Sequence, residues 1–214
     1  MSLNALDDIL DKYPNANTRK TYKRSWHTFF EWCFKRRHTL ENPVKRMDRI
    51  LPDQTQIAIL SLDEVKRLLT AALHLKDGRF VSVVAIGLFA GLRPSEIEEL
   101  QPGDIGENSI LVKGGKLRRT HKRKAPITSI LHKWLKEFPY GQYPKGMQRN
   151  LRHLKTASES KQWVQDIIRH TSISYQLERD KNEDLVAHHN GTSKQMLDRH
   201  YRQVIEQDKD VKEF

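Results

Sequence analysis

Five short segments of the sequence contain side chains that could act on a phosphate group. They are Gly91–Glu96, Gly115-Lys116, Asp166–Thr171, Gly191-Thr192 and His200-Tyr201. A phosphoryl group gathers negative charge on its non-bridging oxygens in a five-coordinate transition state, and guanidinium groups can hold those oxygens through paired hydrogen bonds. The residue types in these segments therefore suit transesterification at a phosphodiester without a metal ion.

The order and spacing of the five segments resemble those of the tyrosine recombinase, or phage integrase, family. The separation is 23 residues from Arg93 to Lys116 and 9 residues from Thr192 to Tyr201. Each motif alone is weak evidence, but five motifs in order with consistent spacing are strong evidence. The resemblance implies a site-specific DNA recombinase or integrase that cleaves and rejoins DNA through a covalent phosphotyrosyl intermediate.

The resemblance also implies a role for four side chains. Arg93 and Arg169 would hold the scissile phosphate, Tyr201 would be the nucleophile, and Lys116 would protonate the leaving 5′ oxygen. A phenol of pKa near 10 needs positive surroundings to lose its proton at neutral pH, and two arginines supply them. Because the energy of the broken bond is kept in a 3′ protein linkage, no cofactor, ATP or metal ion is expected.

Two positions depart from the pattern of the family. Asp166 replaces the usual histidine three residues before the second arginine, and Thr192 replaces the usual histidine or tryptophan after the glycine. Asp166 could still act as a base, whereas a threonine hydroxyl can bind a phosphate oxygen but cannot carry charge. We expect Glu96 to orient an arginine or lysine, and His170 to point about 100° away from Arg169 and to buttress the site without entering it.

The chain carries a large positive charge, with 38 lysines and arginines against 27 acidic residues, which gives +11. The charge is bunched at the start of a helix near residue 20, between residues 113 and 124, and between residues 145 and 155. Clustered cations favour a polyanion, since several phosphate contacts are then made together. The DNA-binding residues expected from these clusters are Arg19, Lys20, Lys23, Arg24, Arg118, Arg119, Lys122, Arg123, Arg149 and Arg152.

Helices dominate the pattern of apolar residues. Asn17 is expected to cap a basic amphipathic helix, and Ser61 with Glu64 has the spacing of a capping box. The stretch Phe80–Ala90 predicts a buried helix that Gly91 stops, and Pro94 is well placed to begin the next short helix. The apolar face expected for the first helix consists of Tyr22, Trp26, Phe29, Phe30 and Cys33.

Short strands are expected only in the middle of the chain. The segments Ile110–Lys113 and Ala125–Ile127 flank the Gly114-Gly115 turn and predict a β-hairpin that carries the second basic cluster. The fold class predicted is mostly α with a small antiparallel β-sheet (α+β), with the tyrosine recombinase catalytic fold and a small N-terminal helical domain.

A break in the periodicity around residues 49–55 predicts two modules. Residues 1–55 would form a helical core-binding module and residues 56–214 the catalytic domain. The resemblance covers about residues 57–205, and more weakly residues 14–47. It implies two modules that clamp double-stranded DNA from opposite sides, a tetramer on DNA and a monomer without it.

The composition of the chain argues against several other classes of protein. No run of about 18 apolar residues and no leader peptide is present, so membrane insertion and secretion are not expected. The single cysteine, Cys33, excludes a disulfide within the chain and fits a reducing, cytoplasmic compartment, with association with the nucleoid of a prokaryote or phage-infected cell. The segment Met1–Leu3 is typical of a cloning remnant, which would mean that the natural N-terminus was trimmed. The pair His188-His189 has no zinc-motif spacing.

Two other functions remain open at this stage. A DNA-binding protein of the same fold with impaired catalysis would explain Asp166 and Thr192. An RNA-binding or ribosome-associated basic protein would explain the charge but not the ordered spacing of the five segments.

Overall fold

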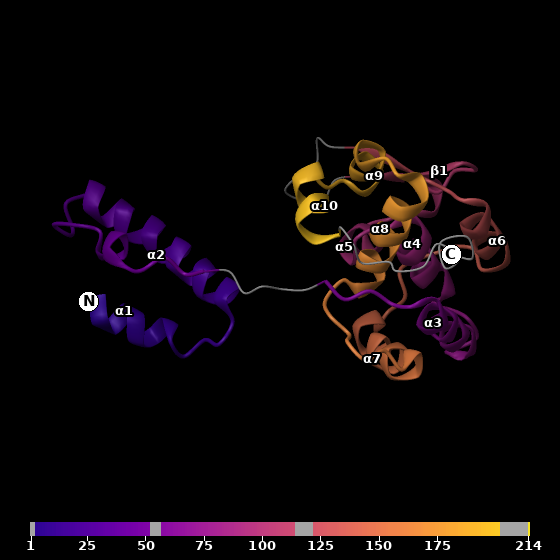
Figure 1. Cartoon of the computed structure of the whole chain (residues 1–214), viewed down its shortest axis with the longest axis horizontal. Coiled ribbons are helices and arrows are strands. Elements are labelled where there is room, and N and C mark those ends of the chain that lie inside the picture. The colour runs from indigo at the N-terminus through magenta and orange to yellow at the C-terminus, as the bar shows by residue number, and fades with distance from the viewer. Residues whose placement is uncertain (1–2, 52–56, 114–121, 202–213) are drawn as a thin grey trace. The chain divides into compact units, whose positions relative to one another are not determined.

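The computed structural model describes residues 3–51, 57–113, 122–201 and 214. The chain divides into two compact units, which span residues 1–55 and 56–214 (Figure 1). Most of the chain is helical, and the described strands form one two-stranded sheet. In the described ranges, no helix is long and apolar enough to cross a membrane.

The smaller unit consists of α1 (Leu3–Leu10), α2 (Ala16–Lys35) and the 3₁₀ helix η1 (Pro43–Arg46). Helix α2 begins earlier than predicted, since Asn15 is its cap and accepts a 3.0 Å hydrogen bond from the Thr18 N–H. Both asparagines are good caps, and use of the earlier one extends the helix by about half a turn.

The apolar face predicted for α2 is only partly buried. Cys33 is buried, and Trp26 and Phe30 pack against the core of this unit. Tyr22 and Phe29 are exposed, at 38% and 57%. The periodicity predicts an apolar face but not how much of it is covered; in the described part of this unit, α2 contacts the short elements α1 and η1. The core itself consists of Leu6, Leu10, Val44 and Met47.

The larger unit is built around α4 (Val81–Ala90), in which every residue is buried. A helix that is apolar on all sides must be covered on all sides. Accordingly α4 packs against α3 (Leu62–His74), α6 (Ser129–Glu137) and α8 (Ile167–Asp180) (Figure 1). The prediction of a buried helix is thereby confirmed.

The predicted ends of the neighbouring helices are also confirmed. Gly91 ends α4 in the left-handed region, and Pro94 is the first residue of α5 (Pro94–Glu98). At the start of α3, the Glu64 carboxylate accepts a 2.7 Å hydrogen bond from the Ser61 N–H, and the Ser61 hydroxyl accepts from the Glu64 N–H. This is the capping box that the sequence predicted.

The predicted hairpin is present, with shifted ends. Strands β1 (Ser109–Val112) and β2 (Arg123–Pro126) are antiparallel, and Val112 lies opposite Arg123. Because β2 begins two residues earlier than predicted, Arg123 belongs to the strand and not to the basic turn. The 3₁₀ helix η2 (Pro102–Asp104) precedes the hairpin.

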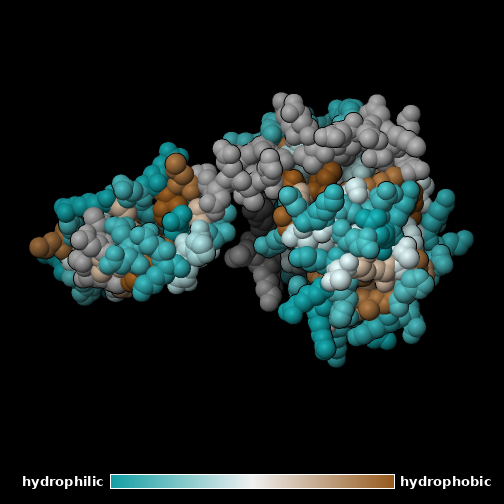
Figure 2. Space-filling view, turned by 60° about the horizontal axis from the view of Figure 1, so that its bottom comes forward, coloured by the Kyte–Doolittle hydropathy of each residue, from teal (hydrophilic) through white to brown (hydrophobic). Residues whose placement is uncertain are grey.

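The remaining helices complete the unit. Helix α7 (Met147–Ser158) packs on α3, and α9 (Glu183–Asn190) lies between α8 and β2 and also contacts α10 (Lys194–His200). Figure 2 shows a mainly hydrophilic visible surface on this unit, with apolar patches between. Phe214 packs on the core of this larger unit, where its ring stacks on Tyr175 with centroids 4.1 Å apart.

Candidate active site

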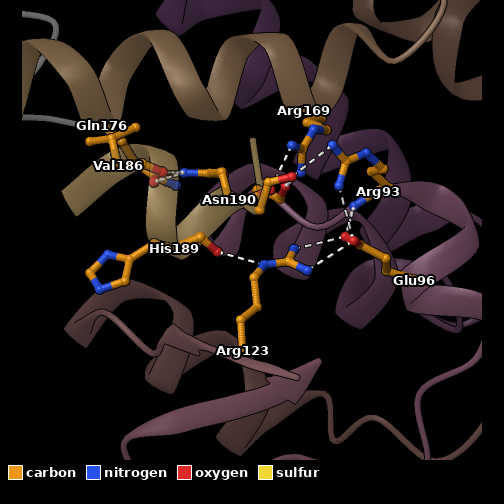
Figure 3. A network of polar contacts seen from close by, with 10 residues as sticks. Arg93, Glu96, Arg123, Arg169, Gln176, Val186, His189 and Asn190 are labelled. Carbon is orange, nitrogen blue, oxygen red and sulfur yellow. Dashed lines mark hydrogen bonds and ion pairs between the residues drawn. The ribbon is translucent and has the colours of Figure 1, made fainter. Parts of the chain in front are cut away.

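Three arginines converge on the C-terminal end of α9. The consecutive carbonyl groups of residues 189–191 accept hydrogen bonds from Arg123 (2.9 Å), Arg169 (2.7 Å) and Arg93 (3.1 Å), respectively (Figure 3). The last carbonyls of a helix have no partner within it and form the negative end of the helix dipole, so they attract cations. Arg93 and Arg169, far apart in the sequence, are thereby brought to one short turn.

Arg169 is a buried and fixed cation. Its side chain comes from α8, the residue is only 5% exposed, and its guanidinium donates to the carbonyls of Gly91 and Asn190. Burial, reinforced by the charge of Arg93, lowers the pKa of Arg169 to about 10, so the group is still protonated at neutral pH. Arg93 is the more accessible arginine, with 38% of its side chain exposed.

A buried amide fixes the turn that holds Arg169. The Asn190 side chain donates to the Gln176 amide oxygen (2.6 Å) and to the Val186 carbonyl (3.0 Å) (Figure 3). Gly91 packs so closely on it that an added Cβ would lie 2.1 Å from the Asn190 side-chain oxygen. The two ends of the site, after α4 and after α9, therefore fit together only with glycine at position 91.

Glu96 binds two of the three arginines, whereas the sequence predicted that it would orient one arginine or lysine. Its carboxylate accepts hydrogen bonds from Arg93 and, at both oxygens, from Arg123. Burial raises the pKa of Glu96, but the hydrogen bonds and charge of Arg123, followed by those of Arg93, outweigh it and lower the pKa below its ordinary value. Glu96 is therefore an anion that orients the Arg93 guanidinium.

Tyr201 follows α10 and is buried, at 9% exposure. Burial raises the pKa of its phenol, and the charges of Arg169 and Arg93 work in the opposite direction. Asp166 adds to the effect of burial and raises the pKa of Tyr201 further. The two arginines proposed to bind phosphate are thus close enough to stabilise a phenolate at Tyr201.

His170 contacts the Tyr201 hydroxyl directly. Its Nδ1 atom lies 2.7 Å from the Tyr201 Oη atom. The sequence predicted that His170 would buttress the site without entering it, and the contact brings its imidazole directly to the hydroxyl of the expected nucleophile. Arg169 and His170 are neighbours on α8 and reach two different partners: Arg169 donates to the Asn190 carbonyl at the end of α9, and His170 contacts Tyr201 after α10. No local pattern in the sequence shows that placement.

Asp166 stands at the N-terminal end of α8 in a left-handed conformation, with φ 58°. Its side chain makes no capping hydrogen bond to that helix. It lines a cavity of about 570 Å³ together with Arg169, Arg152 and Lys155. Thr192 is half-buried after the α9 turn, where its N–H donates to the Ala187 carbonyl.

The described residues among those expected to bind DNA fall into three groups. Arg24, Lys122, Arg149 and Arg152 are exposed, whereas Arg19 and Lys20 are half-buried. The ammonium of Lys23 donates to the carbonyls of Met47 and Asp48, and Arg123 binds Glu96 and the α9 turn. Both side chains are thus held by other groups of the protein. Lys116, Arg118 and Arg119 lie outside the described residues.

The described part of the chain lacks a candidate metal site. There, no group of three or more histidine, cysteine, aspartate or glutamate side chains could hold a metal ion. The chemistry that the described side chains can carry is the binding of an anion by two guanidiniums beside a buried phenol.

The sequence matches no protein-family model and no curated protein. Solved structures are similar. A lambda integrase (75–356) dimer bound to a COC′ core site has a TM-score of 0.78 at 15% identity and covers 97% of this chain and 83% of that one. XerA recombinase has a TM-score of 0.59 at 18% identity, covering 99% and 88%.

A lambda integrase tetramer bound to a Holliday junction is similar as well. Its TM-score is 0.75 at 14% identity, and the match covers 96% of this chain and 66% of that one. At these low sequence identities, the structural similarity establishes the fold alone. The chain has the fold of the tyrosine recombinases, as the order of its motifs predicted.

Proposed function

We propose that this protein is a site-specific DNA recombinase or integrase that cleaves and rejoins DNA through a covalent phosphotyrosyl intermediate. The observation that carries the proposal is the convergence of Arg93 and Arg169 on adjacent carbonyls at the end of α9, with the Tyr201 phenol within range of both charges. A scissile phosphate placed there would meet two guanidiniums and a nucleophile together.

The reaction needs only groups that the chain supplies. The Tyr201 oxygen attacks phosphorus, the bond from phosphorus to the 5′ oxygen breaks, and a proton passes to that oxygen, for which Lys116 is the candidate donor. Rejoining reverses the same steps. Arg93 and Arg169 neutralise the charge on the non-bridging oxygens and cost no reorganisation, because the protein already holds them in place.

The expected partner is double-stranded DNA. The exposed cations Arg24, Lys122, Arg149 and Arg152 support this choice, since clustered positive charge releases counterions from a duplex. Similar chains that are bound to a core site and to a Holliday junction support a function on DNA and assembly as a tetramer.

A second candidate is a DNA-binding protein with impaired catalysis. Asp166 favours it, because this carboxylate raises the pKa of the proposed nucleophile and lies on the cavity beside Arg169. The two candidates differ in one product, the covalent adduct.

The experiment is capture on a duplex that carries a nick just after the scissile phosphate, so that the cleaved strand diffuses away and religation is prevented. The enzyme gives a protein–DNA adduct that survives denaturing detergent, and Tyr201→Phe gives none while retaining DNA affinity. Wild-type binding without an adduct on duplexes drawn from the protein's own recombination site would favour the impaired protein.

A further inference from the structure

The imidazole of His170 contacts the hydroxyl of the proposed nucleophile, Tyr201. Its Nδ1 atom is 2.7 Å from Tyr201 Oη, which is ordinary hydrogen-bond geometry for this pair. The two rings lie with centroids 5.7 Å apart, and the contact joins α8 to the end of α10. Any proton that leaves the phenol along this bond arrives at the imidazole.

We propose that His170 is the general base of strand cleavage, accepting the Tyr201 proton at Nδ1. The inference rests on the proposed function, whose mechanism does not name the group that accepts the Tyr201 proton. A neutral imidazole that carries its proton on Nε2 presents a lone pair at Nδ1, and an imidazole ordinarily titrates near pH 6.5, which suits a base at neutral pH.

The charges around the phenol favour His170 over Asp166. Arg169 and Arg93 lower the pKa of Tyr201 and would stabilise the phenolate, whereas the negative charge of Asp166 raises it. In the described structure Asp166 makes no hydrogen bond to Tyr201, and its charge opposes the anion that attack requires. A neutral acceptor removes the proton without placing a second negative charge beside the phosphate.

The step balances with the groups named. As the Tyr201 oxygen forms its bond to phosphorus, its proton passes to His170 Nδ1 and leaves an imidazolium. The bond from phosphorus to the 5′ oxygen breaks with its electron pair on oxygen, which takes a proton from a separate donor. In the rejoining reaction the imidazolium returns its proton to the leaving phenolate.

The test is single-turnover cleavage of the nicked duplex across about pH 5 to 9, which brackets the imidazole titration. Wild-type protein should show a rate that rises as the imidazole becomes neutral. His170→Gln keeps a hydrogen-bonding side chain but cannot accept a proton, so its rate should fall by about a hundredfold or more and lose that rise. His132→Gln, at an exposed histidine of α6, is the matched control and should behave as wild type.

Chemical rescue separates a proton acceptor from a packing residue. His170→Ala should regain cleavage in proportion to the concentration of neutral imidazole added to the buffer. Melting temperature and DNA affinity of each variant show whether it has folded. The proposal is overturned if folded His170→Gln cleaves at the wild-type rate with the wild-type pH profile, or if imidazole leaves folded His170→Ala as slow as before.

Spectroscopy gives a readout that does not depend on activity. In protein labelled with ¹⁵N-histidine, His170 Nδ1 should be unprotonated at neutral pH, with a chemical shift that changes in Tyr201→Phe. A protonated Nδ1 in the free protein would contradict the proposal. Failure of the proposed function looks different, since wild-type protein would then form no adduct at any pH.

Discussion

Arg123 binds Glu96 through two parallel hydrogen bonds, of 2.9 and 2.8 Å, one to each carboxylate oxygen. Both side chains are nearly buried, at 11% and 10% exposure. The same carboxylate accepts from the Arg93 side chain and from its backbone N–H. Arg123, on the sheet, thus fixes the anion that orients Arg93 in the candidate active site.

Arg123→Met should destabilise the fold strongly, because it leaves a buried carboxylate with one partner fewer. We expect a loss of about 3 kcal/mol in the free energy of unfolding, and a smaller loss in the Glu96→Gln, Arg123→Met double variant, in which no buried charge is stranded. Urea denaturation of both single variants and the double variant measures the coupling. Additive losses would show that the two side chains act independently.

Acid should weaken the fold through Glu96. Its pKa is lowered in the folded state, so its contribution is complete above the unfolded value of about 4.3 and is lost as the pH falls through the lowered folded value. The difference in unfolding free energy between wild type and Glu96→Gln should shrink in that window. Urea titrations at pH 7 and at successive acid steps measure it; a constant difference would contradict the assignment.

Asp166→Asn should lower the pKa of Tyr201. The Asp166 charge raises the pKa of that phenol, and asparagine removes the charge while keeping the shape. Ultraviolet titration of the variant, with the matching Tyr201→Phe proteins subtracted to isolate one phenol, gives the shift. An unchanged or higher pKa would show that Asp166 acts on Tyr201 by some route other than its charge.

Arg169→Ala and Arg93→Ala should each slow strand cleavage by about a hundredfold or more, which is the scale for removing one fixed donor to a developing oxyanion. Arg169→Ala should also destabilise the fold, because the buried guanidinium of Arg169 donates hydrogen bonds to two carbonyl groups. The loss of stability in Arg93→Ala should be smaller, because the Arg93 side chain is partly exposed. Single-turnover capture and thermal melts on the same preparations separate the two effects. Equal losses of stability in the two variants would contradict the expectation that the buried arginine contributes more to folding than the partly exposed one.

Gly91→Ala should destabilise the larger unit by about 2 kcal/mol or more. Position 91 has φ 66°, where an L side chain is strained, and its Cβ would collide with the Asn190 side-chain oxygen. Gly103→Ala is the control, because nothing lies within 4 Å of an added Cβ there. Differential scanning calorimetry compares the two, and similar melting temperatures would refute the expected clash.

The sequence was most informative where a rule is local. The uniformly apolar stretch before Gly91, the serine and glutamate at the start of α3 and the proline that opens α5 each predict structure from a few neighbouring residues. Local rules failed where two neighbours satisfy the same rule, as at Asn15 and Asn17. They also failed on the face of α2, because its burial depends on how much partner surface the small unit provides.

The sequence named candidate residues for the site but not their arrangement. The resemblance named Arg93, Arg169 and Tyr201, and the structure brings all three to the α9–α10 region. The sequence indicated only a supporting place for His170 and did not single out Asn190. Their positions result from how α8, α9 and α10 pack, which no short sequence pattern encodes.

The α9 turn has a consequence for the evolution of this chain. Three successive peptide units, 189–191, each receive a guanidinium from a different part of the fold. An insertion or deletion of one residue there would shift every one of these pairings by a position, and no single compensating substitution could restore them. Among natural variants of this protein the turn should therefore keep its length, and it should also keep Asn190, whose buried amide fixes it.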